Sequence, residues 1–314
     1  MTKRLQNRIA ESRYTLPVTV LYSITIWFFA GLVSQQWWIQ FACFAVSASM
    51  MMLLNRENIL IRIYSRMVSS VYLALSCAAV FFFASLSSAV MQMGAATSLF
   101  LLWHSYQDKK AVGWAYYTFL CLGIGSIMQH QVLFYLPIFW IIMRWFTYSL
   151  SWRTFCATLM GLLTPYWFCL PYFAIQGEKS IELLSSHLNG FANLTAPPDY
   201  SLLNITQLVY LGFLVVLMVI GSLHFIINSF RETIRVRQIY YSFILMAAFS
   251  LFLIIVRPQC YDMAILVLIL TSSPMIAHFF TLTKSRFTNY LFIITLTLIF
   301  LFTAYQLWIS SLPF

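Results

Sequence analysis

The chain has 314 residues, of which 61% are hydrophobic and only 8% are charged. Soluble proteins carry about 25% charged and about 45–50% apolar residues, so this composition excludes an ordinary soluble domain and predicts an all-α, polytopic transmembrane helix bundle. The net charge of +10 would indicate a nucleic-acid partner in a soluble domain. Membrane proteins instead gather Lys and Arg in cytoplasmic loops, so we expect no nucleic-acid partner.

Eleven apolar segments approach the length of a membrane span, which needs about 20 residues with a range of about 17–25. In chain order they cover residues 16–34, 37–54, 68–88, 92–107, 111–128, 132–149, 153–175, 202–228, 239–256, 262–282 and 288–311. Together they predict one membrane domain over residues 1–314. The fourth and fifth segments are short, which leaves half-buried or re-entrant helices open there. Four prolines are expected to interrupt helices: Pro137, Pro165, Pro171 and Pro274.

The basic residues predict the orientation of the chain. With a cytoplasmic N-terminus, sixteen of the eighteen Lys and Arg residues fall in cytoplasmic segments, and only Lys179 and Arg257 lie outside. An odd number of spans then places the C-terminus on the periplasmic side of the membrane. Residues 1–15 form a basic cytoplasmic segment. The stretch Arg56–Arg66 is interpreted as a positive flank of a span, with anchoring to an anionic membrane surface as the alternative.

Small residues occur in two of the predicted spans. They are the Gly and Ser residues of LGIGS (Leu122–Ser126) and the glycine of MGLLTP (Met160–Pro165). Small side chains allow membrane helices to approach closely, although neither stretch is a GxxxG motif. We expect close helix packing at these two places.

The main polar segment, residues 177–201, separates two strongly apolar regions and is predicted to be the principal periplasmic loop. Four carboxylates on the same predicted side are candidate catalytic residues because each is able to act as a general base. These are Glu178, Glu182, Asp199 and Asp262.

Arg257 is the basic residue that departs most clearly from the orientation rule, because it lies between two apolar runs. Two interpretations stay open: its guanidinium binds a lipid phosphate at the membrane surface, or it pairs with nearby Asp262 or extends to the interface. His130, in a tight QHQ turn on the same side, is a second candidate ligand for the lipid phosphate.

Other chemistry has no support in the sequence. His104, His224 and His278 are scattered, without metal-binding spacing, and the six cysteines contain no CxxC pair. There is no phosphate-binding glycine loop and no nucleophile elbow. We therefore predict no metal and no cofactor. No acidic residue lies deep in a predicted span, which argues against a proton-coupled transporter.

The segment Val112–Gly177, with its aromatic span ending at Arg144 and the following SWR and GLLTPYW, resembles an integral-membrane family of Bacteroidota that has no assigned activity. The patterns R-x-R-Q-x-Y-Y (Arg235–Tyr241) and P-x-x-Y-D (Pro258–Asp262) fit the same family. The resemblance is specific over about a fifth of the chain. It implies an inner-membrane location.

Short helices joined by tight turns, followed by an outward loop, also resemble GT-C glycosyltransferases, which use polyprenyl-phosphate sugar donors. Those enzymes place a catalytic carboxylate in a large first outward loop. Here that loop is Ser34-Gln35-Gln36 and has no carboxylate. The leading hypothesis is therefore a lipid-binding or assembly component of envelope glycan biogenesis, with envelope-assembly proteins as partners. A GT-C-like enzyme is the alternative, and a transporter or flippase is the third hypothesis.

Overall fold

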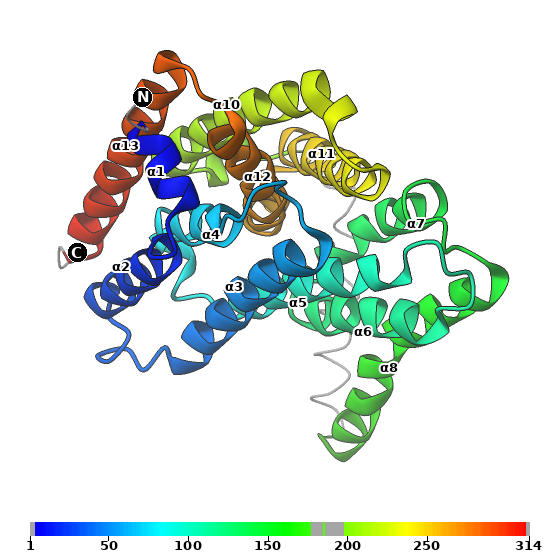
Figure 1. Cartoon of the computed structure of the whole chain (residues 1–314). Coiled ribbons are helices and arrows are strands. Elements are labelled where there is room, and N and C mark those ends of the chain that lie inside the picture. Colours follow the sequence, from blue (N-terminus) through cyan, green and yellow to red (C-terminus); the bar gives the residue numbers. More distant parts are fainter. Residues whose placement is uncertain (1–3, 177–184, 186–197, 312–314) are drawn as a thin grey trace.

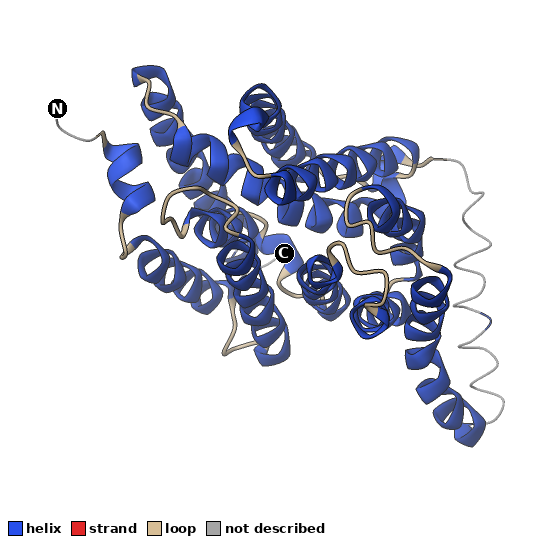
Figure 2. Ribbon diagram, turned by 45° about the vertical axis from the view of Figure 1, so that its right-hand side comes forward, coloured by secondary structure: helices blue, strands red, loops and turns tan. Residues whose placement is uncertain are grey.

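The computed structural model describes residues 4–176, 185 and 198–311. Every regular element in these ranges is helical, as Figure 2 shows. The α-helices are α1 (Leu5–Glu11), α2 (Thr15–Ala30), α3 (Trp38–Asn58), α4 (Met67–Cys77), α5 (Leu86–Leu102), α6 (Val112–Met128), α7 (Leu136–Trp145), α8 (Trp152–Gln176), α10 (Ile205–Asn228), α11 (Ile234–Val256), α12 (Tyr261–Leu282) and α13 (Arg286–Ser311). The 3₁₀ turns are η1 (Val80–Phe82), η2 (Trp103–Ser105), η3 (His130–Tyr135), η5 (Tyr200–Leu202), η6 (Ser229–Arg231) and η7 (Pro258–Cys260). The all-α prediction is confirmed.

Each of the eleven predicted segments overlaps one main α-helix, but the segment 68–88 also covers η1 and the start of α5, and the segment 132–149 begins in η3. Within the described ranges, six helices are long and apolar enough to cross a membrane: α3, α5 with η2, α10, α11, α12 and α13. Helices α2, α4 and α6 are apolar but shorter, at 16, 11 and 17 residues. The chain therefore has the architecture of a multi-pass membrane protein.

The prediction about which segments are short was wrong for the fourth one. Helix α5 starts earlier than predicted and runs into η2, so that Leu86–Ser105 is a continuous apolar element of 20 residues. Among the described α-helices that match predicted spans, the shortest are instead α4, with 11 residues, and α7, with 10 residues. Each rises only about 15–17 Å, roughly half the hydrocarbon thickness. The hydropathy pattern did not reveal how short these two helices are, because the adjoining 3₁₀ turns, η1 and η3, are as apolar as the helices themselves.

The four prolines do not interrupt helices as predicted. Pro137 lies in the first turn of α7, where its missing N–H costs no hydrogen bond. Helix α8 continues through Pro165 and Pro171, and α12 continues through Pro274. Membrane helices tolerate internal prolines. The Tyr240 hydroxyl lies 3.4 Å from the Pro274 carbonyl oxygen and ties α11 to this part of α12.

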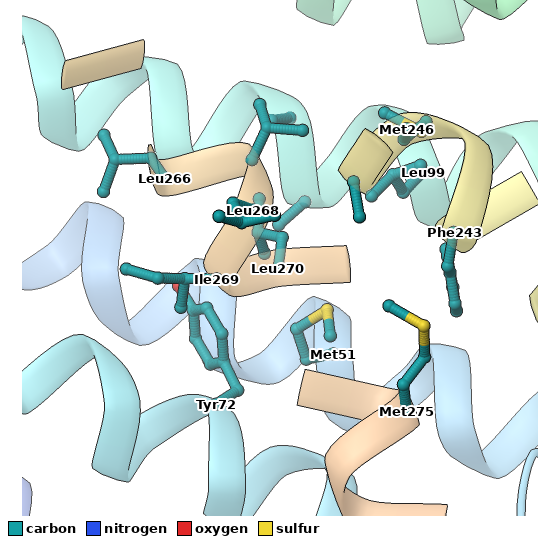
Figure 3. Packing of buried hydrophobic residues seen from close by; sticks show 14 of the residues in the cluster. Met51, Tyr72, Leu99, Phe243, Met246, Leu266, Leu268, Ile269, Leu270 and Met275 are labelled. Atoms are coloured by element: carbon teal, nitrogen blue, oxygen red, sulfur yellow. The ribbon is translucent and has the colours of Figure 1, made fainter. Parts of the chain in front are cut away.

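Helix α12 lies in the middle of the bundle, with α4, α5, α10 and α11 packed around it (Figure 1). Every residue from Met263 to Thr281 is buried, as expected for a helix that is apolar on all sides. Figure 3 shows Leu266, Leu268, Ile269, Leu270 and Met275 of α12 packed with side chains of the neighbouring helices. These neighbours are Met51, Tyr72, Leu99, Phe243 and Met246.

The loops gather at two opposite ends of the bundle. At one end, the Ser65 hydroxyl donates to the Ala10 carbonyl oxygen at 2.7 Å, and the Gln107 N–H donates to the Thr147 carbonyl oxygen at 2.7 Å. This end holds the basic segments, and we call it the basic end. The other end holds η3, η5 and η7, and we call it the opposite end. The expected separation of basic and non-basic loops is therefore present in three dimensions.

Candidate functional site

Arg257 ends helix α11 at the opposite end. It precedes Pro258, and a residue before proline is disfavoured in the helical conformation, so the helix stops here. The guanidinium carbon of Arg257 lies 5.7 Å from the centre of the Phe134 ring, a distance suited to a cation–π contact. The aromatic ring holds the arginine beside η3 without neutralising its charge.

His130 is the first residue of η3 and lies at the same end as Arg257. The neighbouring Gln131 side chain donates to the Gln259 carbonyl oxygen of η7 at 3.2 Å. This hydrogen bond joins the turn after α6 to the turn after α11. The two residues predicted to bind a lipid phosphate are therefore brought to one region by elements that are far apart in the sequence.

Asp199 has a structural role at this end. Its Oδ1 accepts hydrogen bonds from the Ser201 N–H at 3.0 Å and from the Ser201 hydroxyl at 2.6 Å, and so caps η5. The Ser201 hydroxyl, and then its N–H, lower the pKa of this exposed carboxyl. A carboxylate with a lowered pKa is a weaker base, so Asp199 is the weaker of the two described catalytic candidates.

Asp262 is exposed in the first turn of α12, where the helix dipole favours a negative charge. It does not pair with Arg257: the described ion pairs join other residues. The interpretation of Arg257 as the partner of Asp262 was therefore wrong. The remaining catalytic candidates, Glu178 and Glu182, lie outside the described residues.

A second polar cluster lies at the basic end, and the sequence did not reveal it. Arg62 Nε lies 2.9 Å from Oε1 of Glu232, and His278 Nε2 lies 3.3 Å from the same oxygen. The Glu232 side chain is 3% exposed and the His278 side chain 1%, whereas Arg62 is 43% exposed. One buried carboxylate thus links the loop after α3, the loop after α10 and the central helix.

Aromatic rings enclose the His278 end of this cluster. The rings of Phe225 and Tyr240 each lie 5.2 Å from the His278 ring, and the His224 ring lies 5.6 Å away. The Tyr240 hydroxyl donates to the Leu60 carbonyl oxygen at 3.2 Å, which fixes the loop that carries Arg62. Two of the three histidines that are scattered in the sequence, His224 and His278, therefore lie side by side, whereas His104 pairs with Glu57.

One sequence signal pointed to this cluster. Glu232 stands alone among basic residues in the short connection before α11, between Arg231 and Arg235. An acid in a basic connection has cationic neighbours and is therefore a candidate for an ion pair. Its partner was not recognisable, because Arg62 belongs to a different connection.

The opposite end offers an arginine that no described carboxylate neutralises, while the basic end holds a buried ion pair of structural character. The first arrangement suits recognition of an anion and the second suits stabilisation of the bundle. Among the described residues, no three His, Cys, Asp or Glu side chains gather as a metal site requires. Comparison with protein-family models, with curated proteins and with solved structures finds no match to this chain.

Proposed function

We propose that this chain is an inner-membrane protein that binds a polyprenyl-phosphate or related lipid phosphate at its opposite end. It would act in envelope glycan biogenesis as a lipid-binding or assembly component. The observation that carries the proposal is the placement of Arg257. Its guanidinium rests against Phe134 near the membrane surface, and no described carboxylate lies within ion-pair distance. A half-buried, uncompensated arginine is suited to bidentate binding of a phosphate.

The proposal includes a topology of eleven spans, with the basic end in the cytoplasm and the opposite end in the periplasm. The gathering of basic loops at one end supports this orientation. A 3₁₀ turn lengthens the shortest of these spans. The turn η3 and helix α7 together rise about 27 Å, which is close to the hydrocarbon thickness of about 30 Å. The location in the inner membrane, and membership of the Bacteroidota family that the sequence resembles, are part of the same proposal.

Loss of the Arg257 side chain is expected to weaken lipid-phosphate binding. The purified protein in mild detergent is mixed with a polyprenyl phosphate, and retained lipid is measured by native mass spectrometry. Arg257→Ala should retain about tenfold less lipid, since a charge-assisted hydrogen bond contributes about 1.5–3 kcal/mol. Arg257→Lys should fall between the two, because an ammonium keeps the charge but loses the planar fork.

Arg286→Ala is the matched control for this experiment. Arg286 is also an arginine at a helix terminus, but it is exposed and lies at the basic end. Arg286→Ala should leave the retention of polyprenyl phosphate unchanged. Equal retention by the parent and by Arg257→Ala would remove the basis of the proposed site.

A GT-C-like glycosyltransferase is the second candidate, and the position of Asp262 favours it. This exposed carboxylate follows η7 directly, only one short turn after Arg257, and is not held by an ion pair with it. In such an enzyme, Asp262 would take a proton from the acceptor hydroxyl while Arg257 binds the donor phosphate.

Asp262→Asn separates the two candidate functions. If the chain is a glycosyltransferase, this variant should transfer sugar from a polyprenyl-phosphate donor at least 100-fold more slowly but still retain the lipid. The amide keeps the shape of the carboxylate but is not able to act as a general base. A lipid-binding component should show neither loss. Asp199→Asn serves as the comparison, since Asp199 caps a turn.

A further inference from the structure

A lateral groove opens between α2 and α3 on the side of the bundle. Both helices pack on α4, and they contact each other where the Trp27 ring of α2 lies 5.5 Å from the rings of Phe41 and Phe44 of α3. Leu16 and Val20 of α2 form one wall, Ala45 and Ala48 of α3 form the other, and Leu73 of α4 lies on the floor. The walls of the groove are apolar, so it suits a hydrocarbon chain.

The groove has the length of one leaflet. Its lining residues on α3 extend from Phe41 to Met52, a rise of about 16 Å at 1.5 Å per residue. Half of a hydrocarbon core of about 30 Å is about 15 Å. The two serines in its walls do not make it polar, because Ser23 and Ser49 donate to carbonyl oxygens of their own helices at 2.8 Å.

A basic pocket continues the groove at the basic end. Arg56, Arg62 and Arg66 line this pocket, and no carboxylate does. Because Arg62 is already paired with Glu232, Arg56 and Arg66 are the arginines available to an anion. Met52 and Ser69 line both the groove and the pocket, so the two spaces adjoin. The apolar groove, which is as long as one leaflet is thick, thus ends at a cluster of guanidinium groups.

Ser69 marks the junction with an unsatisfied polar group. The residue is buried, and its hydroxyl has no hydrogen-bond partner. A buried hydroxyl without a partner is costly, and most such groups in folded proteins are satisfied. A lipid with its chain in the groove and its phosphate among the arginines would place its ester oxygens at this level.

We propose that the groove between α2 and α3 and the adjoining arginine pocket form a binding site for an anionic glycerophospholipid of the leaflet at the basic end. Charge complementarity selects the headgroup, and the length of the groove selects an acyl chain. This site is separate from the one proposed at Arg257. It does not depend on that function, because it lies at the other end of the bundle.

The test uses the full chain in mild detergent with an equimolar mixture of dioleoylphosphatidylglycerol and dioleoylphosphatidylcholine. The two lipids have the same chains, but only the first has a net negative charge. Native mass spectrometry should show preferential retention of the anionic lipid. Each basic residue near an anionic lipid contributes about fivefold, so Arg56→Gln combined with Arg66→Gln should lower that retention by about 25-fold.

Groove variants test the acyl-chain part of the proposal. Ala45→Trp and Val20→Trp, from opposite walls, should lower retention of both lipids, whereas Ala42→Trp should not. Ala42 is also exposed on α3, but it does not line the groove. Arg257→Ala should leave retention of the anionic lipid unchanged, which separates this site from the opposite end.

Either of two results overturns the proposal: equal retention of the two lipids by the parent, or full retention by both tryptophan variants. If inorganic phosphate displaces the lipid fully while the tryptophan variants bind normally, the pocket binds a free phosphate and the groove has no role. Thermal stability of each variant, measured without added lipid, should match that of the parent because all the substituted positions are at least partly exposed.

Discussion

Arg62→Gln is expected to lower the free energy of unfolding by about 3 kcal/mol. The substitution removes the positive partner of Glu232, whose side chain is 3% exposed, and leaves a buried carboxylate beside His278. Breaking a buried ion pair from one side costs about 3–5 kcal/mol, and the partial exposure of Arg62 places the effect at the lower end. Unfolding in mixed micelles with increasing sodium dodecyl sulfate measures this loss.

A double-mutant cycle shows whether the pair is the cause. Glu232→Gln should restore much of the stability lost in Arg62→Gln, because the variant with both substitutions has no uncompensated buried charge. Arg56→Gln is the control, since Arg56 is an exposed arginine nearby and belongs to none of the described ion pairs. Glu57→Gln should cost at most about 1 kcal/mol, because its pair with His104 is partly exposed. Additive effects of Arg62→Gln and Glu232→Gln would argue against a coupled pair.

The helices were predictable because each is recorded locally in the sequence. A membrane span is a continuous run of apolar residues, and the basic residues of a loop indicate on which side of the membrane that loop lies. The burial of α12 on all sides also follows from its composition, since the segment 263–281 has no charged residue and only His278 as a titratable one. The position of a span, the side of a loop and the burial of an apolar helix can each be predicted from a window of about 20 residues.

The polar contacts were not predictable in the same way. Glu232 and His278 are 46 residues apart and meet only because α10, α11 and α12 pack together. The groove between α2 and α3 depends on how both helices pack on α4, which a hydropathy pattern does not record. The turns that carry His130 and Arg257 were predicted only to lie on one side of the membrane. The hydrogen bond from Gln131 to Gln259 joins these turns, and the sequence does not record that contact.

The small residues in α6 and α8 are an instructive intermediate case. The sequence predicted a close approach without naming the partners, and the structure confirms it. A Cβ atom added to Gly123 would lie 2.7 Å from the Leu162 carbonyl oxygen of α8, closer than side chains are found. The hydroxyls of Tyr116 and Thr164 lie 3.0 Å apart across the same interface. The spacing of the glycines thus predicted the packing but not the geometry.

Gly161→Ala is expected to destabilise the bundle by about 1–3 kcal/mol. A Cβ atom at Gly161 would overlap the Tyr116 carbonyl oxygen and lie 3.1 Å from the Leu120 nitrogen, and both are backbone atoms of α6 that have no rotamer to change. Helix α8 must therefore move away from α6, and overpacking of this kind costs about 1–3 kcal/mol. Gly212→Ala is the control, because nothing lies within 4 Å of a Cβ atom there. Alanine at that position in α10 should be neutral or stabilising by up to about 1 kcal/mol, through helix propensity. Unfolding in sodium dodecyl sulfate compares the two variants, and equal stability would show that α6 and α8 are not in close contact.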